Sequence, residues 1–258
     1  MQTATEAAEA LRAGIDLLDV KDPARGSLGQ PDPAQLQAVL DTRDRIARAT
    51  PVSVALGEFS DWTDASSLES ASVLSRVAYA KLGLADMAGR RDWRLQWERL
   101  RNQIEVNANE APGWVAVIYA DWAIAGSPAP DEIVAAAAET GCAGVLIDTF
   151  CKHRGRLLEH FSPADLCLLS VQVRDAGMFF AVAGQLQSGD LPQLAQVPLD
   201  VIAVRSAVCE GGNRQSRFSL SRMESFREAM RRAFAGVGAH DVSGDHHIHS
   251  SHGVVSAE

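Results

Sequence analysis

Short apolar runs alternate along the chain with longer stretches in which apolar residues recur at helical spacing. The apolar runs are the predicted strands, and they cover Ile15–Lys21, Val52–Leu56, Val77–Gly83, Trp114–Ala120, Gly144–Asp148, Met178–Ala183 and Val201–Arg205. The amphipathic stretches are the predicted helices, and they lie near Thr5–Ala13, Pro33–Ala49, Asp64–Ser75, Arg91–Asn109, Asp131–Thr140, Pro163–Asp175, Leu191–Ala195 and Leu220–Phe234. Strands that are apolar at nearly every position favour a parallel sheet covered by helices.

The order of these elements predicts a barrel with one strand missing. A TIM (β/α)8 barrel needs eight strands and eight helices, and a chain of 258 residues suits one such domain. Because the chain opens directly on a helix, the absent element is the first strand. We therefore predict an α/β TIM barrel lacking its first strand over residues 1–236, with an open doubly wound sheet as the alternative.

Residues 237–258 are predicted to form a disordered tail, because they are polar, rich in Gly, Ser and His, and without periodicity. Four of its histidines, His246, His247, His249 and His252, are candidate metal ligands. Adventitious binding by a flexible segment accounts for them more simply, so we assign no metal site.

Composition narrows the class of protein. Charged residues make up 22% and hydrophobic residues 47% of the chain, which is enough apolar material for a full core. The formal net charge of -9 argues against a nucleic-acid partner or an anionic membrane surface. No apolar run reaches about 18 residues and the first residues carry no apolar signal core, so we expect a cytoplasmic protein. The four cysteines are widely spaced, so we expect reduced thiols rather than disulfides or a zinc site.

The lysines are few and share one kind of position. Only three of the 24 basic residues are lysines, namely Lys21, Lys81 and Lys152. Each lies at or just past the carboxyl end of a predicted strand, where a parallel barrel builds its active site. The period-two alternation of a strand puts Asp19 on the face of Lys21, and Asp148 ends the strand before Lys152. This placement favours a functional role over solvation.

Lysine and carboxylate together point to Schiff-base chemistry. A partly desolvated lysine near other cations has a lowered pKa, and its neutral amine attacks a carbonyl group. A nearby carboxylate moves the protons of carbinolamine dehydration and enolisation. We therefore predict carbon–carbon bond formation or elimination on a small aldehyde or ketone.

Two late loops are candidate phosphate sites. Gly184 and Gln185 follow the sixth predicted strand, and Arg205, Gly211 and Gly212 follow the seventh. These would be strands seven and eight of a complete barrel, whose following loops commonly hold phosphate. Two ordinary turns are the alternative. Three further polar residues lie at strand ends and could face the site: Glu58, Tyr119 and Asp121. The alternatives to a functional role are a solvated glutamate, a tyrosine packed in the core and an aspartate that caps a helix.

Five segments resemble a known family. They are "DLLDVKDPARGSLG", "AYAKLGL", "VLIDTFCKHRGRLLEHF", "AVAGQL" and "VIAVRSAVCEGGNR", and they resemble the (5-formylfuran-3-yl)methyl phosphate synthases. The resemblance implies a TIM barrel that condenses two molecules of glyceraldehyde 3-phosphate to 4-(hydroxymethyl)-2-furancarboxaldehyde phosphate, with loss of phosphate and two waters, for methanofuran-type cofactors. It implies no metal or organic cofactor.

The resemblance also implies roles for single residues. It places the Schiff-base lysine on Lys21, supporting lysines on Lys81 and Lys152, and acid/base carboxylates on Asp19 and Asp148. Gln185 departs from the family pattern, which has a small hydroxyl residue there, and the missing strand and the His-rich tail depart from it too.

Two other functions stay open at this stage. One is a class I aldolase that acts on another sugar phosphate, and the other is a non-catalytic barrel that binds a phosphorylated metabolite. The expected partner in each case is a small phosphate ester such as a triose phosphate. The sequence is compatible with a homo-oligomer and does not decide the oligomeric state.

Overall fold

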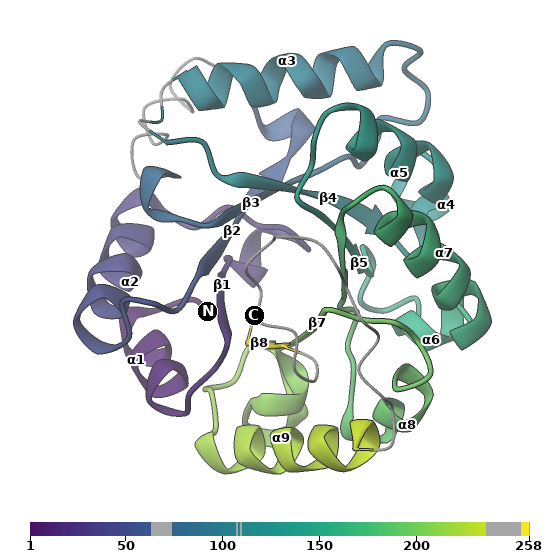
Figure 1. Ribbon diagram of the computed structural model, residues 1–258. Coiled ribbons are helices and arrows are strands. Elements are labelled where there is room, and N and C mark those ends of the chain that lie inside the picture. Colours follow the sequence, from purple (N-terminus) through teal and green to yellow (C-terminus); the bar gives the residue numbers. More distant parts are fainter. Residues whose placement is uncertain (63–73, 107, 109, 236–253, 258) are drawn as a thin grey trace.

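A computed structural model describes residues 1–62, 74–106, 108, 110–235 and 254–257 of the chain. Within these residues eight parallel strands follow one another around a closed barrel (Figure 1). The strands are β1 (Leu17–Val20), β2 (Val52–Glu58), β3 (Tyr79–Gly83), β4 (Gly113–Tyr119), β5 (Gly144–Asp148), β6 (Phe179–Val182), β7 (Val201–Val204) and β8 (Val254–Ala257). The TIM-barrel prediction is confirmed, and the open sheet is excluded.

Helices cover the outside of this barrel (Figure 1). They are α1 (Ala4–Arg12), α2 (Pro33–Ile46), α3 (Trp93–Val106), α4 (Trp122–Ala125), α5 (Pro130–Glu139), α6 (Leu157–His160), α7 (Pro163–Asp175), α8 (Leu191–Leu194) and α9 (Leu220–Phe234). Most of the helix predicted at Asp64–Ser75 lies outside the described residues. None of the helices described is long and apolar enough to span a bilayer.

The strands are buried on both faces, which explains their nearly continuous apolar sequences. Outward-facing residues such as Val54 and Ile118 join the core under the helices. Inward-facing residues such as Leu17, Val115 and Leu146 form a separate cluster inside the barrel. At the amino-terminal end of β3 the ring of Tyr79 meets that of Phe179 edge to face, with centroids 5.2 Å apart.

Local sequence signals set the ends of the helices. At the start of α7 the Ser162 hydroxyl accepts a hydrogen bond from the Asp165 N–H, and the Asp165 carboxylate accepts one from the Ser162 N–H. Pro163 occupies the first turn, where it has no backbone hydrogen bond to lose. The apolar face of the helix then buries Leu166 and Val173. The predicted start at Ser162–Pro163 is confirmed.

The position of the missing first strand is occupied by the end of the chain. Strand β8 pairs in parallel with β7 on one side, where Ile202 is opposite Val255, and with β1 on the other, where Leu18 is opposite Ala257. Four residues of the segment expected to be a disordered tail are therefore a barrel strand. Residues 236–253 and 258, which include the four candidate histidines and the expected domain boundary, lie outside the described residues.

The backbone of Met1 also bonds to the edge of β1 that pairs with β8. Its backbone nitrogen donates to the Asp19 carbonyl, and its carbonyl accepts from the Lys21 N–H at 3.4 Å. On the opposite edge of β1 the Leu18 N–H donates to Pro51, so the alternating N–H groups of Asp19 and Lys21 face β8. Both ends of the chain thus cover the edge of β1 that a first strand would cover (Figure 1).

We expect Val255→Pro to lower the stability of the full chain, because proline has no N–H to donate to the ladder and its ring disturbs a strand that is flanked on both sides. A loss of about 3 kcal/mol corresponds to a fall in melting temperature of about 6–12 °C for a domain of this size. Thermal unfolding measures it, with Val255→Thr as the matched variant that keeps the N–H and the branched side chain. Equal melting temperatures for the two variants would show that β8 does not contribute to the fold.

Candidate active site

The five residues predicted for catalysis meet at the carboxyl ends of three strands. Lys81 on β3 forms an ion pair with Asp19 on β1. Lys21, directly after β1, lies 3.8 Å from the carboxylate of Asp148 at the end of β5. Lys152, in the loop after β5, donates to the same carboxylate at 2.7 Å. One connected set of charges therefore joins β1, β3 and β5.

Asp148 is the centre of this set. It is 1% exposed and accepts hydrogen bonds from Lys152, from the Thr149 N–H at 2.7 Å and from the Ser27 hydroxyl at 3.3 Å. Burial alone would raise the pKa of this carboxyl, but the charges of Lys152 and Lys21 and these hydrogen bonds hold the pKa far below its ordinary value. Asp148 is thus a carboxylate at any physiological pH.

Asp19 has one oxygen committed and one available. Burial acts to raise its pKa, and the charges of Lys81 and Lys21 outweigh burial and lower it. Oδ1 accepts the hydrogen bond from Lys81, whereas the buried Oδ2 has no hydrogen-bond partner among the residues described. Asp19 and Lys81 also line a small cavity inside the barrel. Oδ2 is therefore the oxygen of Asp19 that is not already engaged by a neighbouring side chain.

The loop after β1 contacts the end of β5 through a buried serine. The Asp22 N–H donates to the Gly29 carbonyl at 2.8 Å, and a side chain at position 29 would collide with the Asp22 backbone. The fold of this loop buries Ser27, whose hydroxyl donates to the Thr149 carbonyl at 2.9 Å besides its contact with Asp148. Ser27 lies inside the motif "GSLG" but was not among the residues predicted for the site.

The loop after β5 is held from two sides. The two carboxylate oxygens of Asp121 accept from the N–H groups of Phe150 and Cys151 at 2.6 and 2.8 Å. The Gln185 amide donates to the Lys152 carbonyl at 3.0 Å. Asp121 precedes α4 without capping it through its side chain. Asp121 and Gln185 thus position the backbone that carries Lys152, a role that sequence reasoning did not find.

The predicted phosphate residues lie where the strand count placed them, after β6 and β7. Gly184 has a φ of +101° and its carbonyl accepts from the Leu157 N–H at 3.0 Å. Gly211 and Gly212 form an exposed turn with φ values of +61° and +71°. Their contact with a phosphate group stays a prediction.

Arg205, which was also predicted to bind phosphate, has several partners within the fold. Its guanidinium is buried and donates to both carboxylate oxygens of Glu6, at 3.2 and 2.9 Å, and to the carbonyls of Arg214 and Ser216. These bonds engage the donors of the side chain and connect α1 to the loop after β7. This placement favours a structural role over phosphate binding.

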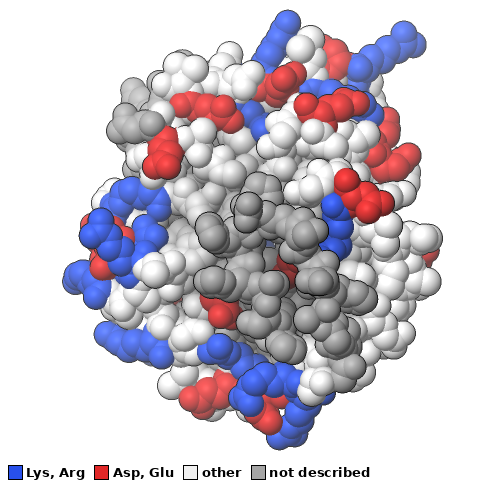
Figure 2. All heavy atoms as spheres, in the orientation of Figure 1, with Lys and Arg blue, Asp and Glu red and all other residues white. Residues whose placement is uncertain are grey.

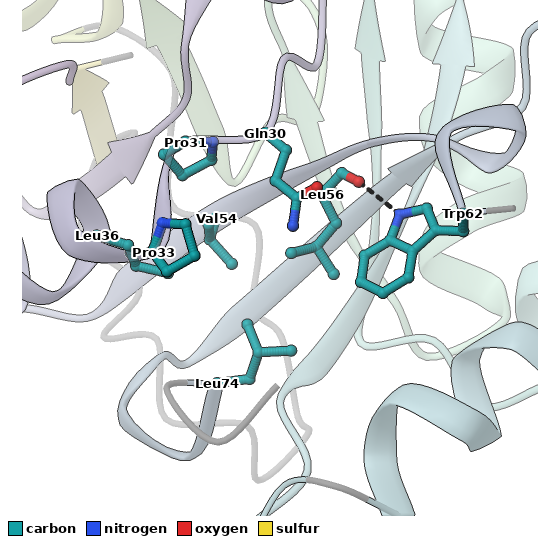
Figure 3. A pocket seen from close by; sticks show the side chains of 8 residues that line it. All are labelled: Gln30, Pro31, Pro33, Leu36, Val54, Leu56, Trp62 and Leu74. Atoms are coloured by element: carbon teal, nitrogen blue, oxygen red, sulfur yellow. Dashed lines mark hydrogen bonds between the residues drawn. The ribbon is translucent and has the colours of Figure 1, made fainter. Parts of the chain in front are cut away.

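A second pocket among the described residues is lined by no charged side chain. This pocket, outside the barrel between β2 and α2, is lined by apolar side chains and Gln30, and the Trp62 indole donates to the Leu56 carbonyl there at 2.7 Å (Figure 3). On the face seen in Figure 2 basic and acidic side chains are mixed around the rim. The charged strand ends inside the barrel are therefore the candidate active site.

Sequence comparison matches this chain to a known family. The family model for 4-HFC-P synthase matches residues 1–227. The (5-formylfuran-3-yl)methyl phosphate synthases of Methanococcus maripaludis strain S2 and Methanothermobacter thermautotrophicus are each 31% identical to this chain, with 82% of it and 88% of the relative covered. A protein named as a putative synthase of the same kind from Kitasatospora aureofaciens is 31% identical, with 84% and 86% covered.

Similar solved structures share the barrel. Phosphoribosyl anthranilate isomerase from Thermus thermophilus has a TM-score of 0.56 at 12% identity, covering 90% of this chain and 96% of its own. A ribulose-1,5-bisphosphate carboxylase/oxygenase from Pyrococcus horikoshii has a TM-score of 0.59 at 16% identity, covering 92% of this chain and 55% of its own. At these identities the likeness concerns the fold alone. The family-model match over residues 1–227 and the relatives at 31% identity show that the chain belongs to the 4-HFC-P synthase family.

Proposed function

We propose that this protein condenses two molecules of glyceraldehyde 3-phosphate, through a Schiff base on Lys21, to 4-(hydroxymethyl)-2-furancarboxaldehyde phosphate. The observation that carries the proposal is the gathering of all three lysines of the chain with two buried carboxylates at one end of the barrel. The names of the relatives support the same product.

The first step uses Lys21 and Asp148. The neutral amine of Lys21 attacks the carbonyl carbon of one triose phosphate, which gives a carbinolamine. Asp148, whose carboxylate lies 3.8 Å from the Lys21 amine, takes a proton from the attacking nitrogen and returns it to the departing hydroxyl group. Water leaves, and the substrate is held as an iminium ion on Lys21.

Carbon–carbon bond formation then uses Asp19 and Lys81. The unpaired Oδ2 of Asp19 removes a proton from the carbon next to the iminium, and the resulting enamine attacks the aldehyde of the second molecule. The aldehyde oxygen becomes an alkoxide as the bond forms. The ammonium group of Lys81, which neighbours Asp19, stabilises this negative charge.

Ring closure and elimination complete the product. Two triose phosphates, C3H7O6P each, equal one furan aldehyde phosphate, C6H7O6P, one phosphoric acid and two waters, so the atoms balance. Lys152, whose ammonium is held by Asp148 and by the Thr149 carbonyl at 2.6 Å, donates a proton to the departing phosphate. The loops at Gly184 and at Gly211–Gly212 are the proposed sites for the phosphate groups.

Borohydride trapping tests the Schiff base. We expect glyceraldehyde 3-phosphate and borohydride to give a stable adduct on Lys21, located by peptide mass spectrometry, and an ultraviolet-absorbing furan without borohydride. Lys21→Arg keeps the charge beside Asp148 and should lose both adduct and product. An adduct confined to Lys81 or Lys152 would overturn the assignment of Lys21. A sugar-phosphate product without furan absorbance would instead favour the aldolase.

Acid stability tests the charge cluster. Because the pKa of Asp148 is lowered in the folded state, this carboxylate stabilises the fold above about pH 4, and the stabilisation is lost as the pH falls further. Asp148→Asn leaves the buried Lys21 and the partly buried Lys152 without it, so we expect a loss of about 3 kcal/mol at pH 7, or about 6–12 °C in melting temperature. The loss should shrink toward pH 3.

The matched control is Asp175→Asn, which changes an exposed carboxylate at the end of α7. Its melting temperature should follow the wild-type protein from pH 7 to pH 3. A constant difference between Asp148→Asn and the wild-type protein across this range would contradict the proposed charge on Asp148.

A further inference from the structure

A second acid–base pair lies at the same end of the barrel. The hydroxyl of Tyr119, the last residue of β4, donates a hydrogen bond to the carboxyl group of Glu58, the last residue of β2. The Ala85 N–H donates to the other oxygen of Glu58 at 3.0 Å. Neither side chain has a part in the steps described above.

The fold directs this pair inward. The register between β2 and β3 shifts between Ala55 and Glu58, so that Glu58 comes to lie opposite Gly83. Such an irregularity re-aims the side chain that follows it. A side chain at Gly83 would collide with the Glu58 carboxyl and the Tyr119 hydroxyl, so the missing Cβ makes the space in which the two groups meet.

Tyr119 lies beside the charged cluster. It is opposite Asp148 in the register of β4 and β5, and it shares the inward face of β4 with Val115 and Val117. Its side chain is fully buried, and its ring lies edge-on to Phe150, with centroids 5.1 Å apart. Glu58 is only partly buried. The pair therefore extends from a partly exposed carboxyl group to a hydroxyl group next to Asp148.

Glu58 differs electrically from the two aspartates. Within the described ranges no ion pair involves Glu58, whereas Asp19 and Asp148 contact lysines. Burial raises the pKa of Glu58, the negative charges of Asp61 and Asp86 add to the rise, and the hydrogen bonds from Tyr119 and Ala85 offset part of it. Of these three carboxyl groups, Glu58 is the one whose pKa is raised, so it is the one best suited to carry a proton.

The surroundings of the hydroxyl group are acidic as well. Burial, the neighbouring Glu58, and the charges of Asp148 and Asp121 raise the pKa of Tyr119 well above its ordinary value. The phenol is therefore not an independent acid. It can pass a proton on when a partner supplies one at the same time, since its oxygen both accepts and donates.

We propose that Tyr119 is a further catalytic residue, the proton donor to the hydroxyl group that leaves as water after the two substrates have joined, and that Glu58 is the residue that positions and reprotonates it. In this step Tyr119 gives its proton to the leaving oxygen, and the carbon–oxygen bond breaks with its electron pair on that oxygen. A carboxylate of the cluster takes the proton of the adjacent carbon, and the electron pair of that C–H bond forms the new double bond. The protonated Glu58 restores the proton of Tyr119 and recovers its own from solvent.

This inference rests on the proposed function, so one experiment examines both. Wild-type protein, Tyr119→Phe and Tyr79→Phe are each given glyceraldehyde 3-phosphate, and furan formation is followed by absorbance. Parallel samples are reduced with borohydride, and the mass on Lys21 is measured. Tyr79→Phe is the matched control, because Tyr79 is the other tyrosine of the chain and lies at the opposite end of β3.

We expect Tyr119→Phe to slow furan formation on the order of 100-fold, the lower range for a lost acid–base group. Its total adduct should match the wild-type protein, with the mass shifted from a three-carbon to a six-carbon species, and Tyr79→Phe should match in both. A wild-type rate in Tyr119→Phe, or a loss of adduct equal to its loss of rate, would overturn the role of Tyr119. Absence of any adduct on wild-type protein would overturn the Schiff base itself.

Glu58→Gln tests the positioning residue independently of Tyr119. Gln keeps one acceptor oxygen for the Ala85 N–H, its NH2 group donates to the Tyr119 oxygen, and it carries no transferable acid proton. Wild-type activity should fall as the pH rises through the raised pKa of Glu58, because the protonated form is the one that acts. In Glu58→Gln this limb should be absent and the rate low at every pH. An unchanged pH profile, or a profile merely scaled down, would contradict the role of Glu58.

Discussion

The structure depends on the pairing of buried charges inside a closed barrel. The ammonium groups of Lys21 and Lys81 and two carboxylates are buried at the ends of β1, β3 and β5, and each alone would cost several kcal/mol to bury. The partly buried ammonium group of Lys152 joins them. Asp148 offsets two of the ammonium groups, and Asp19 the third. The loops then serve this cluster, because Ser27 and Asp121 hold the backbone that surrounds Asp148.

The same physics separates the carboxyl groups by function. Where lysines face a buried carboxyl group, as at Asp19 and Asp148, its pKa falls and its resting form is the carboxylate, which can accept a proton from a reactant. Where a tyrosine and a backbone N–H face it instead, as at Glu58, desolvation prevails and the pKa rises. Groups whose environments move their pKa values apart can divide acid and base work within one site.

Sequence reasoning finds what local periodicity encodes. The apolar runs locate β1 to β7, and the period of two together with the end of each run puts Lys21, Lys81 and Lys152 at one edge. It cannot find contacts that only the closed barrel creates. The Arg205–Glu6 pair spans 199 residues and the Ser27–Asp148 contact 121, and four residues of β8 within a polar segment give no periodic signal.

Closure of the barrel bears on the chemistry as well as on stability. Asp19 and Lys21 are carried by β1, and the edge of β1 away from β2 is covered by β8 and Met1. An uncovered edge would let β1 shift relative to β5, and a displacement of about 1 Å can cost on the order of 100-fold in rate. Asp148 and Lys152 belong to β5 and its loop, and β5 lies between β4 and β6. Loss of β8 should therefore disturb the Lys21 end of the Lys21–Asp148 contact first, and leave the Lys152–Asp148 contact intact.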